Sequence, residues 1–398
     1  MKILYVSSTN IWGGATVALY GLLKYMHEKG HEVLVFTPSN KGRFIEELER
    51  INVKWYAPKR HYQVCVWIGQ YKLFTIVKWV FKWMFKIGFV NRTAKKSFLS
   101  VVEDFKPDIV HTNVGPLDIA FDICRHYNIP HVWHMREYQD KDFGMHFVPT
   151  QRSFRKKILS TGNYNIAITK DVFQYWNLRP QNDEVIYDGV FSNSILPTPY
   201  IKNKKNYIIF VGRIEPSKDP LTLLKAYQLY VERNGRSVFD ILLVGNYTAT
   251  LSYKKECDSF IEQHHLTEKV HFLGHRDDVY ELISNAACMV VPSLNEGFGF
   301  ITVEAMLNHC PVIGRYTGGT REQIDNGYQY EKAPIALAFE TVEELSEKIE
   351  YALNSDLSEM IDRAYDMVTT HYSNEICGSN TEQFYNKVLN MYQRTPNK

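Results

Sequence analysis

Short apolar runs alternate with amphipathic stretches along the first half of the chain. Lys2–Ser7 and Glu32–Thr37 are rich in aliphatic and β-branched residues, which is typical of buried strands. Ala15–Lys29, between them, has the periodicity of a helix, and Gly30 ends it. Three later apolar runs predict further strands: Pro107–Thr112, His131–Met135 and Tyr164–Thr169. This repeated strand–helix–strand order predicts a parallel sheet covered by helices on both faces.

The same pattern restarts after a polar linker at residues 191–206. The predicted elements are a helix at Leu221–Arg233 and strands at Tyr207–Val211, Phe239–Val244, Val270–Leu273, Met289–Pro292 and Pro311–Gly314. We therefore expect an α/β protein with two Rossmann-like, doubly wound domains, residues 1–190 and 207–375, facing a central cleft. Residues 376–398 are expected to form a C-terminal helix that packs back on the first domain.

Composition fits two globular domains, but the charge is unevenly divided. The 398 residues are 45% apolar and 23% charged, with a net charge of +2. Residues 1–190 hold 26 Lys and Arg against 17 Asp and Glu, whereas the remainder holds 20 against 27. A basic first half and an acidic second half indicate that the first half faces an anionic partner, such as a membrane surface.

Residues 64–102 combine basic and aromatic side chains without any acidic residue. Lys78, Lys82 and Lys86 recur at every fourth position, so a helix would carry them as one stripe. The neighbouring large apolar residues are Trp79, Phe81, Trp83, Met84, Phe85 and Phe89. We expect a helix that lies in an anionic membrane interface; the alternative is a core helix whose lysines face water. No run of about 18 uncharged apolar residues exists, so no spanning helix is expected.

The cysteines and the N-terminus favour the cytoplasm. The six cysteines form no C-x-x-C pair, which favours free thiols in a reducing compartment, and Cys124, Cys288 and Cys310 lie in apolar runs typical of buried positions. The N-terminal apolar run is too short for the core of a signal peptide. We expect a cytoplasmic protein, peripheral on the inner face of the cell membrane if residues 64–102 bind there.

The segment SLNEGFGFITVEAML, Ser293–Leu307, carries the strongest chemical signal. It follows a predicted strand and opens a helix near Ile301, whose free N–H groups and positive dipole end favour a diphosphate. Gly297 and Gly299 allow the backbone to approach a ligand closely.

Glu296, in the turn, and Glu304, in the first helical turn, are placed to hold the sugar and the ribose at the two ends of one ligand. Together with the intervening EGFG they resemble the E-x7-E motif of the family 4 retaining glycosyltransferases of the GT-B fold, and the order of motifs is similar over nearly the whole chain. The resemblance implies that Glu296 touches the transferred sugar and Glu304 the ribose hydroxyls. Gly297, Phe298 and Gly299 would lie beside the donor.

VGRIEPSKDP, Val211–Pro220, resembles the G-R-x4-K segment of that family. The resemblance implies that Arg213 and Lys218 neutralise the donor diphosphate, and two fixed cations would stabilise the charge that grows on this leaving group. The alternative is a surface Arg and Lys in a βα loop.

Gly13 and Gly14 match the family's glycine-rich loop after the first strand, where the backbone would approach the donor diphosphate; a simple turn would look the same. Gly318–Gly319–Thr320 resembles a later glycine turn of the family, with an ordinary turn as the alternative.

In VWHMREY, His134 matches the histidine that the family places near the transferred sugar, where it binds hydroxyls or polarises the reacting centre. A structural histidine is the alternative, and His111 is expected to be structural. Arg136 and Glu137 are further candidates for contact with the acceptor.

Two other patterns argue against a metal site and against a nicotinamide cofactor. Asp140-Lys141-Asp142 has the D-x-D spacing of metal-dependent transferases, but it lies in a predicted polar loop and cations already serve the diphosphate, so no metal is expected. GGATVA stands where a nicotinamide enzyme would have G-x-G-x-x-G. Asp188-Gly189 stands where the family often has Asn-Gly at the domain junction, a mild departure that a turn explains.

The resemblance thus implies a retaining, metal-independent glycosyltransferase without a cofactor. The expected donor is a nucleotide-diphosphate hexose, UDP in preference to GDP, and the expected acceptor is a glycan or a lipid-linked molecule in surface polysaccharide biosynthesis. No nucleic acid partner is expected. The alternatives are a nucleotide-sugar 2-epimerase of the same fold and a non-catalytic subunit that binds nucleotide sugar.

Overall fold

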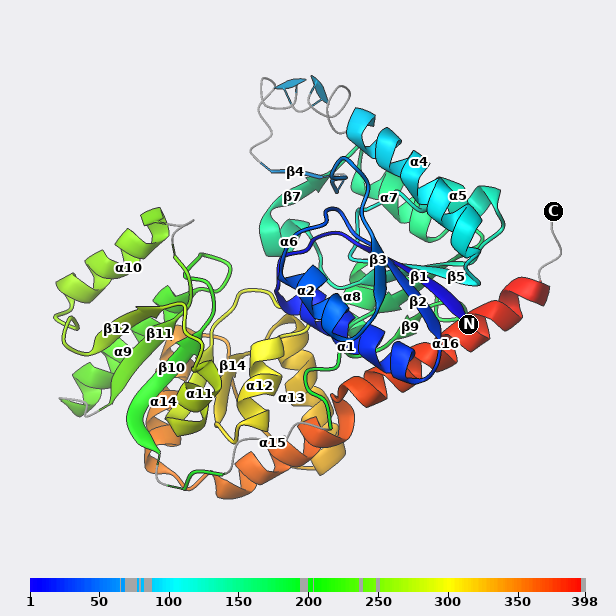
Figure 1. Ribbon diagram of the computed structural model, residues 1–398. Coiled ribbons are helices and arrows are strands. Elements are labelled where there is room, and N and C mark those ends of the chain that lie inside the picture. Colours follow the sequence, from blue (N-terminus) through cyan, green and yellow to red (C-terminus); the bar gives the residue numbers. More distant parts are fainter. Residues whose placement is uncertain are drawn as a thin grey trace. The chain divides into compact units, whose positions relative to one another are not determined.

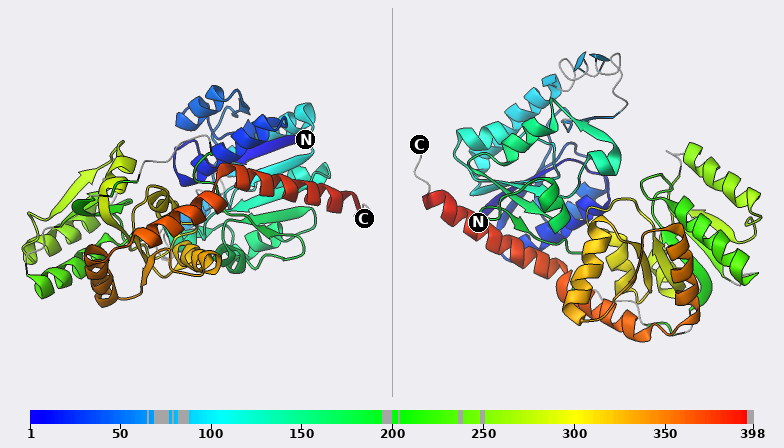
Figure 2. Two further views of the ribbon diagram at one scale, coloured as in Figure 1. Left: turned by 90° about the horizontal axis from the view of Figure 1, so that it is seen from below. Right: turned by 180° about the vertical axis from the view of Figure 1, so that it is seen from behind.

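The computed structural model describes residues 1–64, 66–68, 77–78, 80–81, 88–193, 200–202, 204–235, 239–247 and 251–394. The chain forms two compact units (Figures 1 and 2). Unit 1 comprises Met1–Asn193 and Ser373–Lys398, and unit 2 is the continuous stretch Ser194–Tyr372.

The described part of unit 1 is built on a parallel sheet in the order β3-β2-β1-β5-β6-β8-β9. Its strands are β1 Lys2–Ser7, β2 Glu32–Phe36, β3 Lys54–Tyr56, β5 Ile109–Asn113, β6 His131–Met135, β8 Asn163–Ala167 and β9 Glu184–Val185. A separate antiparallel pair joins β4 Val66–Ile68 to β7 Met145–Phe147. The order reverses at β1, which lies between β2 and β5, and such a switch point is where α/β sheets bind ligands.

Alternate residues of each strand point to opposite faces of this sheet, and helices cover both faces. Ile3 and Tyr5 of β1 join one core cluster, and Leu4 and Val6 join another. The first cluster also takes residues from α1, α2 and α16, and the second from α4 and α5. The helices of unit 1 are α1 Gly14–Glu28, α2 Arg43–Arg50, α4 Gly88–Phe105, α5 Phe121–His126, α6 Asp140–Phe143, α7 Gln151–Ile158, α8 Lys170–Tyr175 and α16 Asn374–Arg394.

Helix α16 lies along unit 1 although it is last in the sequence (Figure 1). Phe384, Tyr385 and Val388 are buried in the cluster that α1 and β1 share. Gly378 of α16 permits α16 to pack closely on α1, because a Cβ at this position would clash with the ring of Tyr25 in α1.

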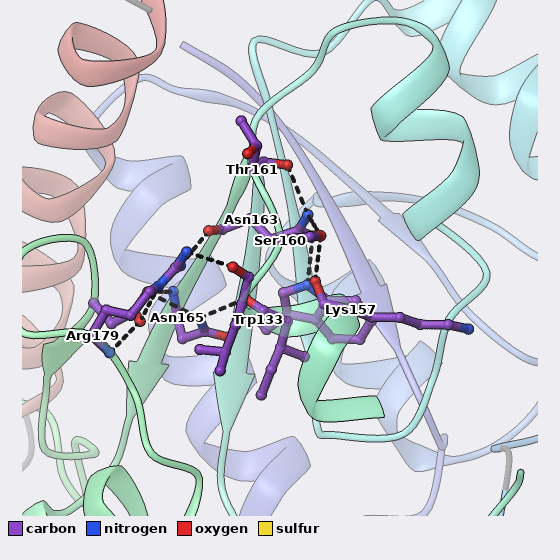
Figure 3. A network of polar contacts seen from close by, with 10 residues as sticks. Trp133, Lys157, Ser160, Thr161, Asn163, Asn165 and Arg179 are labelled. Atoms are coloured by element: carbon purple, nitrogen blue, oxygen red, sulfur yellow. Dashed lines mark hydrogen bonds and ion pairs between the residues drawn. The ribbon is translucent and has the colours of Figure 1, made fainter. Parts of the chain in front are cut away.

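A polar network fixes the amino-terminal side of β6 and β8 (Figure 3). The indole Nε1 of Trp133 donates to Asn163 Oδ1 at 2.8 Å, and Arg179 donates to the backbone carbonyl of Asn163 at 2.6 Å. Arg179 also pairs with Asp183, which accepts from the backbone N–H of Asn165 at 2.9 Å. Ligands of such sheets bind at the opposite, carboxyl ends of the strands, so we assign this network to stability.

Unit 2 repeats the architecture with a parallel sheet in the order β12-β11-β10-β13-β14-β15. Its strands are β10 Lys205–Val211, β11 Asp240–Val244, β12 Val270–Gly274, β13 Ala286–Val291, β14 Val312–Arg315 and β15 Leu337–Phe339. Its helices are α9 Pro220–Asn234, α10 Leu251–Gln263, α11 Val279–Asn285, α12 Phe300–Leu307, α13 Gly318–Glu331, α14 Val342–Asn354 and α15 Ser358–His371. Here the order reverses at β10, which lies between β11 and β13.

The predicted class of two parallel-sheet α/β domains is confirmed, and the predicted strands match observed ones within a few residues. Two local predictions were wrong. Residues 140–143 form the short helix α6 and not a loop. Glu304 lies in the second turn of α12, because this helix begins at Phe300.

Candidate functional site

The topology of unit 2 brings two of the predicted motifs together. Because β10 pairs with β13 in parallel, the loops that leave their carboxyl ends are neighbours. The first loop carries Arg213 and Lys218, and the second carries Glu296. The backbone N–H of Leu294 donates to the carbonyl of Ser217 at 2.9 Å, which ties the two loops directly.

Lys218 and Glu296 form an ion pair. Lys218 Nζ lies 2.6 Å from Glu296 Oε1, and the two side chains are 25% and 12% exposed. Arg213, which is 54% exposed, pairs with Glu215 at 2.9 Å in its own loop. The structure therefore places both predicted cations in the β10–α9 loop and joins one of them to the first predicted glutamate.

Backbone conformation and a backbone hydrogen bond hold the EGFG loop in place. Gly299 is the N-cap of α12 and has φ +87°, which a glycine adopts without strain. The N–H of Gly319 donates to the carbonyl of Glu296 at 2.7 Å, and a Cβ on Gly318 would lie 2.6 Å from the same carbonyl oxygen. Gly318–Gly319–Thr320, predicted as a turn, instead form the first turn of α13, and this helix start supports the EGFG loop. The close approach of the Glu296 and Phe298 backbones leaves no room for a Cβ on Gly318 or Gly319.

Phe298 contributes to the core and not to a ligand surface. Its side chain is 2% exposed and packs edge-on against the rings of Phe300 and Tyr372. Any ligand contact of Phe298 would therefore be made by its backbone. Sequence reasoning grouped it with the donor-binding residues because it could not separate these two uses of an aromatic residue.

Two buried hydroxyls beside Gly299 were not predicted from the sequence. Thr320 Oγ1 and Thr302 Oγ1 would lie 3.3 and 3.5 Å from a Cβ on Gly299. Neither hydroxyl has a hydrogen-bond partner within the described chain. A buried hydroxyl without a partner is costly, so these two are candidates for polar contact at the amino end of α12.

Glu304 has a different hydrogen-bond partner from the Lys218–Glu296 pair. Its Oε1 accepts from the hydroxyl of Tyr280, in α11, at 3.1 Å. Burial raises the pKa of the Glu304 carboxyl, and the hydrogen bond from Tyr280 opposes this shift. A carboxylate held in this way is suited to accept from hydroxyl groups.

In unit 1, Gly13 and Gly14 form the amino end of α1, directly after the β1 loop. Gly13 caps the helix, and its N–H donates to Thr16 Oγ1 at 2.9 Å. A Cβ on Gly13 would meet no described atom within 4 Å, so the backbone there is open to a ligand.

His134 lies in a fully buried cluster at the end of β6. Its side chain is 0% exposed, and its Nδ1 lies 3.3 Å from His111 Nε2. Burial lowers the pKa of both imidazoles well below the usual value, and the nearby Arg136 guanidinium adds to this effect. Both rings are therefore neutral at neutral pH. Of the four ring nitrogens of His111 and His134, only His134 Nε2 has no hydrogen-bond partner within the described chain.

Arg136 is committed to this buried cluster, so it does not reach out as a contact for an acceptor. Its guanidinium forms an ion pair with Asp188, and its Nε donates to Asn113 Oδ1 at 2.7 Å. The predicted turn residue Asp188 is thus a buried partner of Arg136. Sequence reasoning missed this pair because 52 residues separate its members.

The D-x-D carboxylates are used within unit 1. Asp142 accepts from the backbone N–H of Tyr138 at 2.7 Å, and Asp140 accepts from the hydroxyl of Tyr175 at 2.6 Å. In the described part of the chain, no group of three or more His, Cys, Asp or Glu side chains is arranged to hold a metal ion. Cys124, Cys257, Cys288, Cys310 and Cys377 are free and buried.

The predicted membrane segment 64–102 is only partly described. Lys82, Lys86, Trp79, Trp83, Met84 and Phe85 lie outside the described residues. Residues 88–102 belong to α4, which buries Ala94, Phe98 and Val102 in the core of unit 1. Among the described helices, none is long and apolar enough to span a membrane.

Comparison with known families covers most of the chain in two parts. Residues 12–191 match the model "Glycosyltransferase Family 4", and residues 195–367 match the model "Glycosyl transferases group 1". The boundary between the two matches falls where unit 1 gives way to unit 2.

Individual relatives are distant. The chain is 32% identical to the uncharacterized glycosyltransferase MJ1178 of Methanocaldococcus jannaschii over 36% of its length, and 27% identical to the O-antigen chain mannosyltransferase RfbU of Salmonella typhimurium over 44%. These alignments span 37% and 47% of the two relatives. The structure of Anabaena HepE in complex with UDP-glucose superposes with a TM-score of 0.75 at 17% identity, over 97% of this chain and 100% of that one.

Proposed function

The chain belongs to the family 4 glycosyltransferases of the GT-B fold, and from this membership we propose that it transfers a hexose from a nucleotide-diphosphate sugar with retention of the anomeric configuration. One observation carries the assignment of the site. Lys218 and Glu296, a cation and a carboxylate from different loops, meet at the switch point of the unit 2 sheet. Such a point is where doubly wound sheets bind nucleotides.

The proposed reaction depends on stabilising the negative charge of the leaving group. As the sugar–phosphate bond breaks, negative charge grows on the nucleoside diphosphate, and Lys218 with Arg213 would stabilise it from the β10–α9 loop. The amino end of α12 would add its positive dipole. These groups supply the charge that a metal ion supplies elsewhere, so the proposed reaction needs no metal and no cofactor.

Retention places the acceptor hydroxyl on the face from which the diphosphate leaves. The acceptor would attack an oxocarbenium-like centre, and the departing phosphate oxygen would take its proton. Glu296 would contact the transferred sugar and Glu304 the ribose hydroxyls. His134 is fully buried, with Nε2 3.9 Å from Asp188 Oδ1, so it would position its neighbours and would not itself contact the sugar. Gly13, Gly14, Gly297 and Gly299 would approach the donor with their backbones.

The proposed donor is a UDP-hexose and the proposed acceptor is a glycan or a lipid-linked molecule, used in building a surface polysaccharide at the inner face of the cell membrane. HepE binds UDP-glucose, and RfbU is named for O-antigen chains, which supports both choices. The basic residues of the first half fit attachment to an anionic membrane surface.

The test is a transfer assay with a panel of UDP- and GDP-hexoses and ¹H NMR of the product. We expect turnover with one donor and the donor's anomeric configuration in the product. Inversion would refute the retaining mechanism. Incubation with donor alone tests the first alternative, because an epimeric sugar nucleotide would identify a 2-epimerase. Donor binding without turnover of any donor in the transfer assay would identify a non-catalytic subunit.

A further inference from the structure

Arg315 lies beside the proposed donor site but was not among the site residues predicted from the sequence. It is the last residue of β14. Because β10, β13 and β14 are parallel neighbours in that order, their carboxyl ends share one edge of the sheet. Arg315 therefore lies on the edge from which the loops of Lys218 and Glu296 leave. Its side chain is only 18% exposed, so the surrounding protein encloses most of it.

The guanidinium group of Arg315 bonds to two separate segments of the chain. Its Nε donates to the carbonyl of Pro292, directly after β13, at 2.8 Å. Its Nη2 donates to Asp219 Oδ2 at 2.7 Å, in the loop between β10 and α9. The group also lies over the ring of the buried Phe339, 5.4 Å from its centre. Arg315 thus joins the end of β13 to the loop that carries Lys218.

Asp219, the residue after Lys218, depends on side-chain contacts for its conformation. Its φ is +47°, in the left-handed region that residues other than glycine adopt less readily. It is the N-cap of α9, so its conformation sets the direction in which the loop enters the helix. Its Oδ2 accepts from Thr222 Oγ1 at 2.6 Å as well as from Arg315. The carboxylate is therefore held from two sides, and this fixes the backbone next to Lys218.

The contact with both segments requires the shape of an arginine. The donors of a guanidinium group point in fixed directions, so one planar group can hold two acceptors at a set separation. An ammonium group places all its donors on one nitrogen at the end of a flexible stem. The bond from Arg315 to Asp219 is charge-assisted, and with side chains 18% and 17% exposed it is screened less than a pair on an open surface.

We propose that Arg315 is a positioning residue for the donor, which acts through Asp219 to hold the β10–α9 loop in the conformation that presents Lys218 to the diphosphate. In this role Arg315 does not itself touch the donor. The inference rests on the proposed function, because that function assigns Lys218 to the diphosphate. It follows that the loss of Arg315 weakens donor binding only while Lys218 is present.

The test is a double-mutant cycle on the affinity of the full chain for UDP and for GDP, measured by titration calorimetry. Arg315→Ala should raise the Kd of the nucleotide that binds about fivefold, because Lys218 is no longer held in place. In a Lys218→Ala background the same substitution should change the Kd by less than about twofold. The same loss in both backgrounds would show direct contact or a general effect on the fold, and would overturn the proposal. An unchanged Kd in the Arg315→Ala variant would overturn it as well.

Two further variants examine the same contact. Asp219→Asn breaks the ion pair from the side of the loop while asparagine still tolerates a positive φ, so it should weaken nucleotide binding about threefold or more. It replaces Arg315→Ala in the cycle if circular dichroism shows that the alanine variant is unfolded. Arg315→Lys keeps the charge but cannot join the two segments, so it should bind as weakly as the alanine variant. Wild-type affinity in either variant would overturn the proposal.

Arg363→Ala is the matched control. Arg363, on α15, also donates through Nε to a proline carbonyl, that of Pro334 at 3.1 Å, and also pairs with a carboxylate, that of Glu359 at 3.5 Å. These contacts lie outside the loops that carry Lys218 and Glu296, so the variant should keep the wild-type Kd. A loss equal to that of Arg315→Ala would reduce the effect of Arg315 to one on the fold and overturn the proposal.

The transfer assay separates this inference from the proposed function. Arg315→Ala should raise the donor KM about fivefold and leave the acceptor KM within about twofold, and equal rises of both would overturn the positioning role. Binding of neither nucleotide by the wild-type chain would refute the proposed function and this inference with it. Nucleotide binding that follows the cycle in a protein that transfers no sugar would refute the proposed function and leave the positioning role standing.

Discussion

Lys218 Nζ donates to Glu296 Oε1 at 2.6 Å across 78 residues of sequence. Both residues are predicted to contact the donor, yet here each is the partner of the other. A diphosphate would replace the carboxylate as the counter-ion of Lys218, and the released Glu296 would turn to the sugar. In the proposed function, donor binding would exchange one ion pair for another at this place, so substitutions of Lys218 and Glu296 should have different effects.

Lys218→Ala should raise the Kd for the donor about tenfold, because it removes a charge-assisted contact to phosphate. Lys225→Ala is the control, since Lys225 is exposed on α9 of the same unit and lies outside the proposed site. Titration calorimetry with the active UDP-hexose measures both. Unchanged affinity in the Lys218 variant would remove this residue from the site.

Glu296→Gln should affect the reaction rather than donor binding. The substitution keeps the shape and removes the charge that would stabilise the oxocarbenium-like state, so we expect kcat to fall about 100-fold or more while the donor Kd changes only a few-fold. Steady-state kinetics and a binding titration on the same protein give both values. A wild-type kcat would contradict the role of Glu296.

Glu304→Gln should make the unliganded protein more stable at neutral pH. Burial raises the pKa of Glu304, so its ionisation costs stability as the pH rises from the unfolded-state pKa through the raised folded-state pKa. The amide removes this cost, and each kcal/mol regained would raise the Tm by about 2–4 °C. Calorimetry from pH 4.5 to 7.5 should show a flatter profile for the variant, together with weaker donor binding. A lower Tm at pH 7 would refute the prediction.

Unit 1 should lose stability as the pH falls below about 6.5. Burial lowers the pKa of His131 to about 3 and the pKa values of His111 and His134 well below the usual value, so unfolding takes up protons at acid pH. Each neutral histidine removes about 1.4 kcal/mol of stability per pH unit below its unfolded-state pKa. Denaturant titrations at pH 7 and 5.5 measure the slope. His131→Asn should reduce it, and the exposed control His126→Gln should not.

Gly378→Ala should destabilise unit 1 by about 1–3 kcal/mol, although alanine favours helices, because the new Cβ meets the Tyr25 ring of α1. Asn380→Ala, at an exposed position of α16, should be neutral or slightly stabilising. Thermal unfolding compares the two. A gain in Tm for Gly378→Ala would show that α16 does not pack on α1 in solution.

Features that depend on neighbouring residues, such as the strands and the loops that follow them, could be predicted from the sequence. Buried parallel strands such as β13 are apolar throughout, so their positions followed from the residues alone, and the loops after β10 and β13 carried Lys218 and Glu296. Contacts between distant segments could not be predicted in this way. The Arg136–Asp188 pair depends on which strands become neighbours, and so does the hydrogen bond between the Tyr385 hydroxyl and His111 Nδ1, which lie 274 residues apart in the sequence.

The same limit explains a cavity in unit 1 that Asn10, Lys41 and Arg43 line. Lys41 and Arg43 are ordinary surface residues in sequence, and no spacing connects them to Asn10. The pairing of β1 with β2 brings their two loops together.

Helix α16 has a consequence for the synthesis of the protein. Unit 2 is continuous and complete at Tyr372, whereas unit 1 takes its last helix from residues 373–398. At about 5–20 residues per second, the ribosome needs roughly 9–36 s to make the 179 residues of unit 2 after Asn193 has been added. During this time the nascent first unit exposes the apolar groove that Phe384, Tyr385 and Val388 later fill. The unit that is translated first is thus the last to be completed.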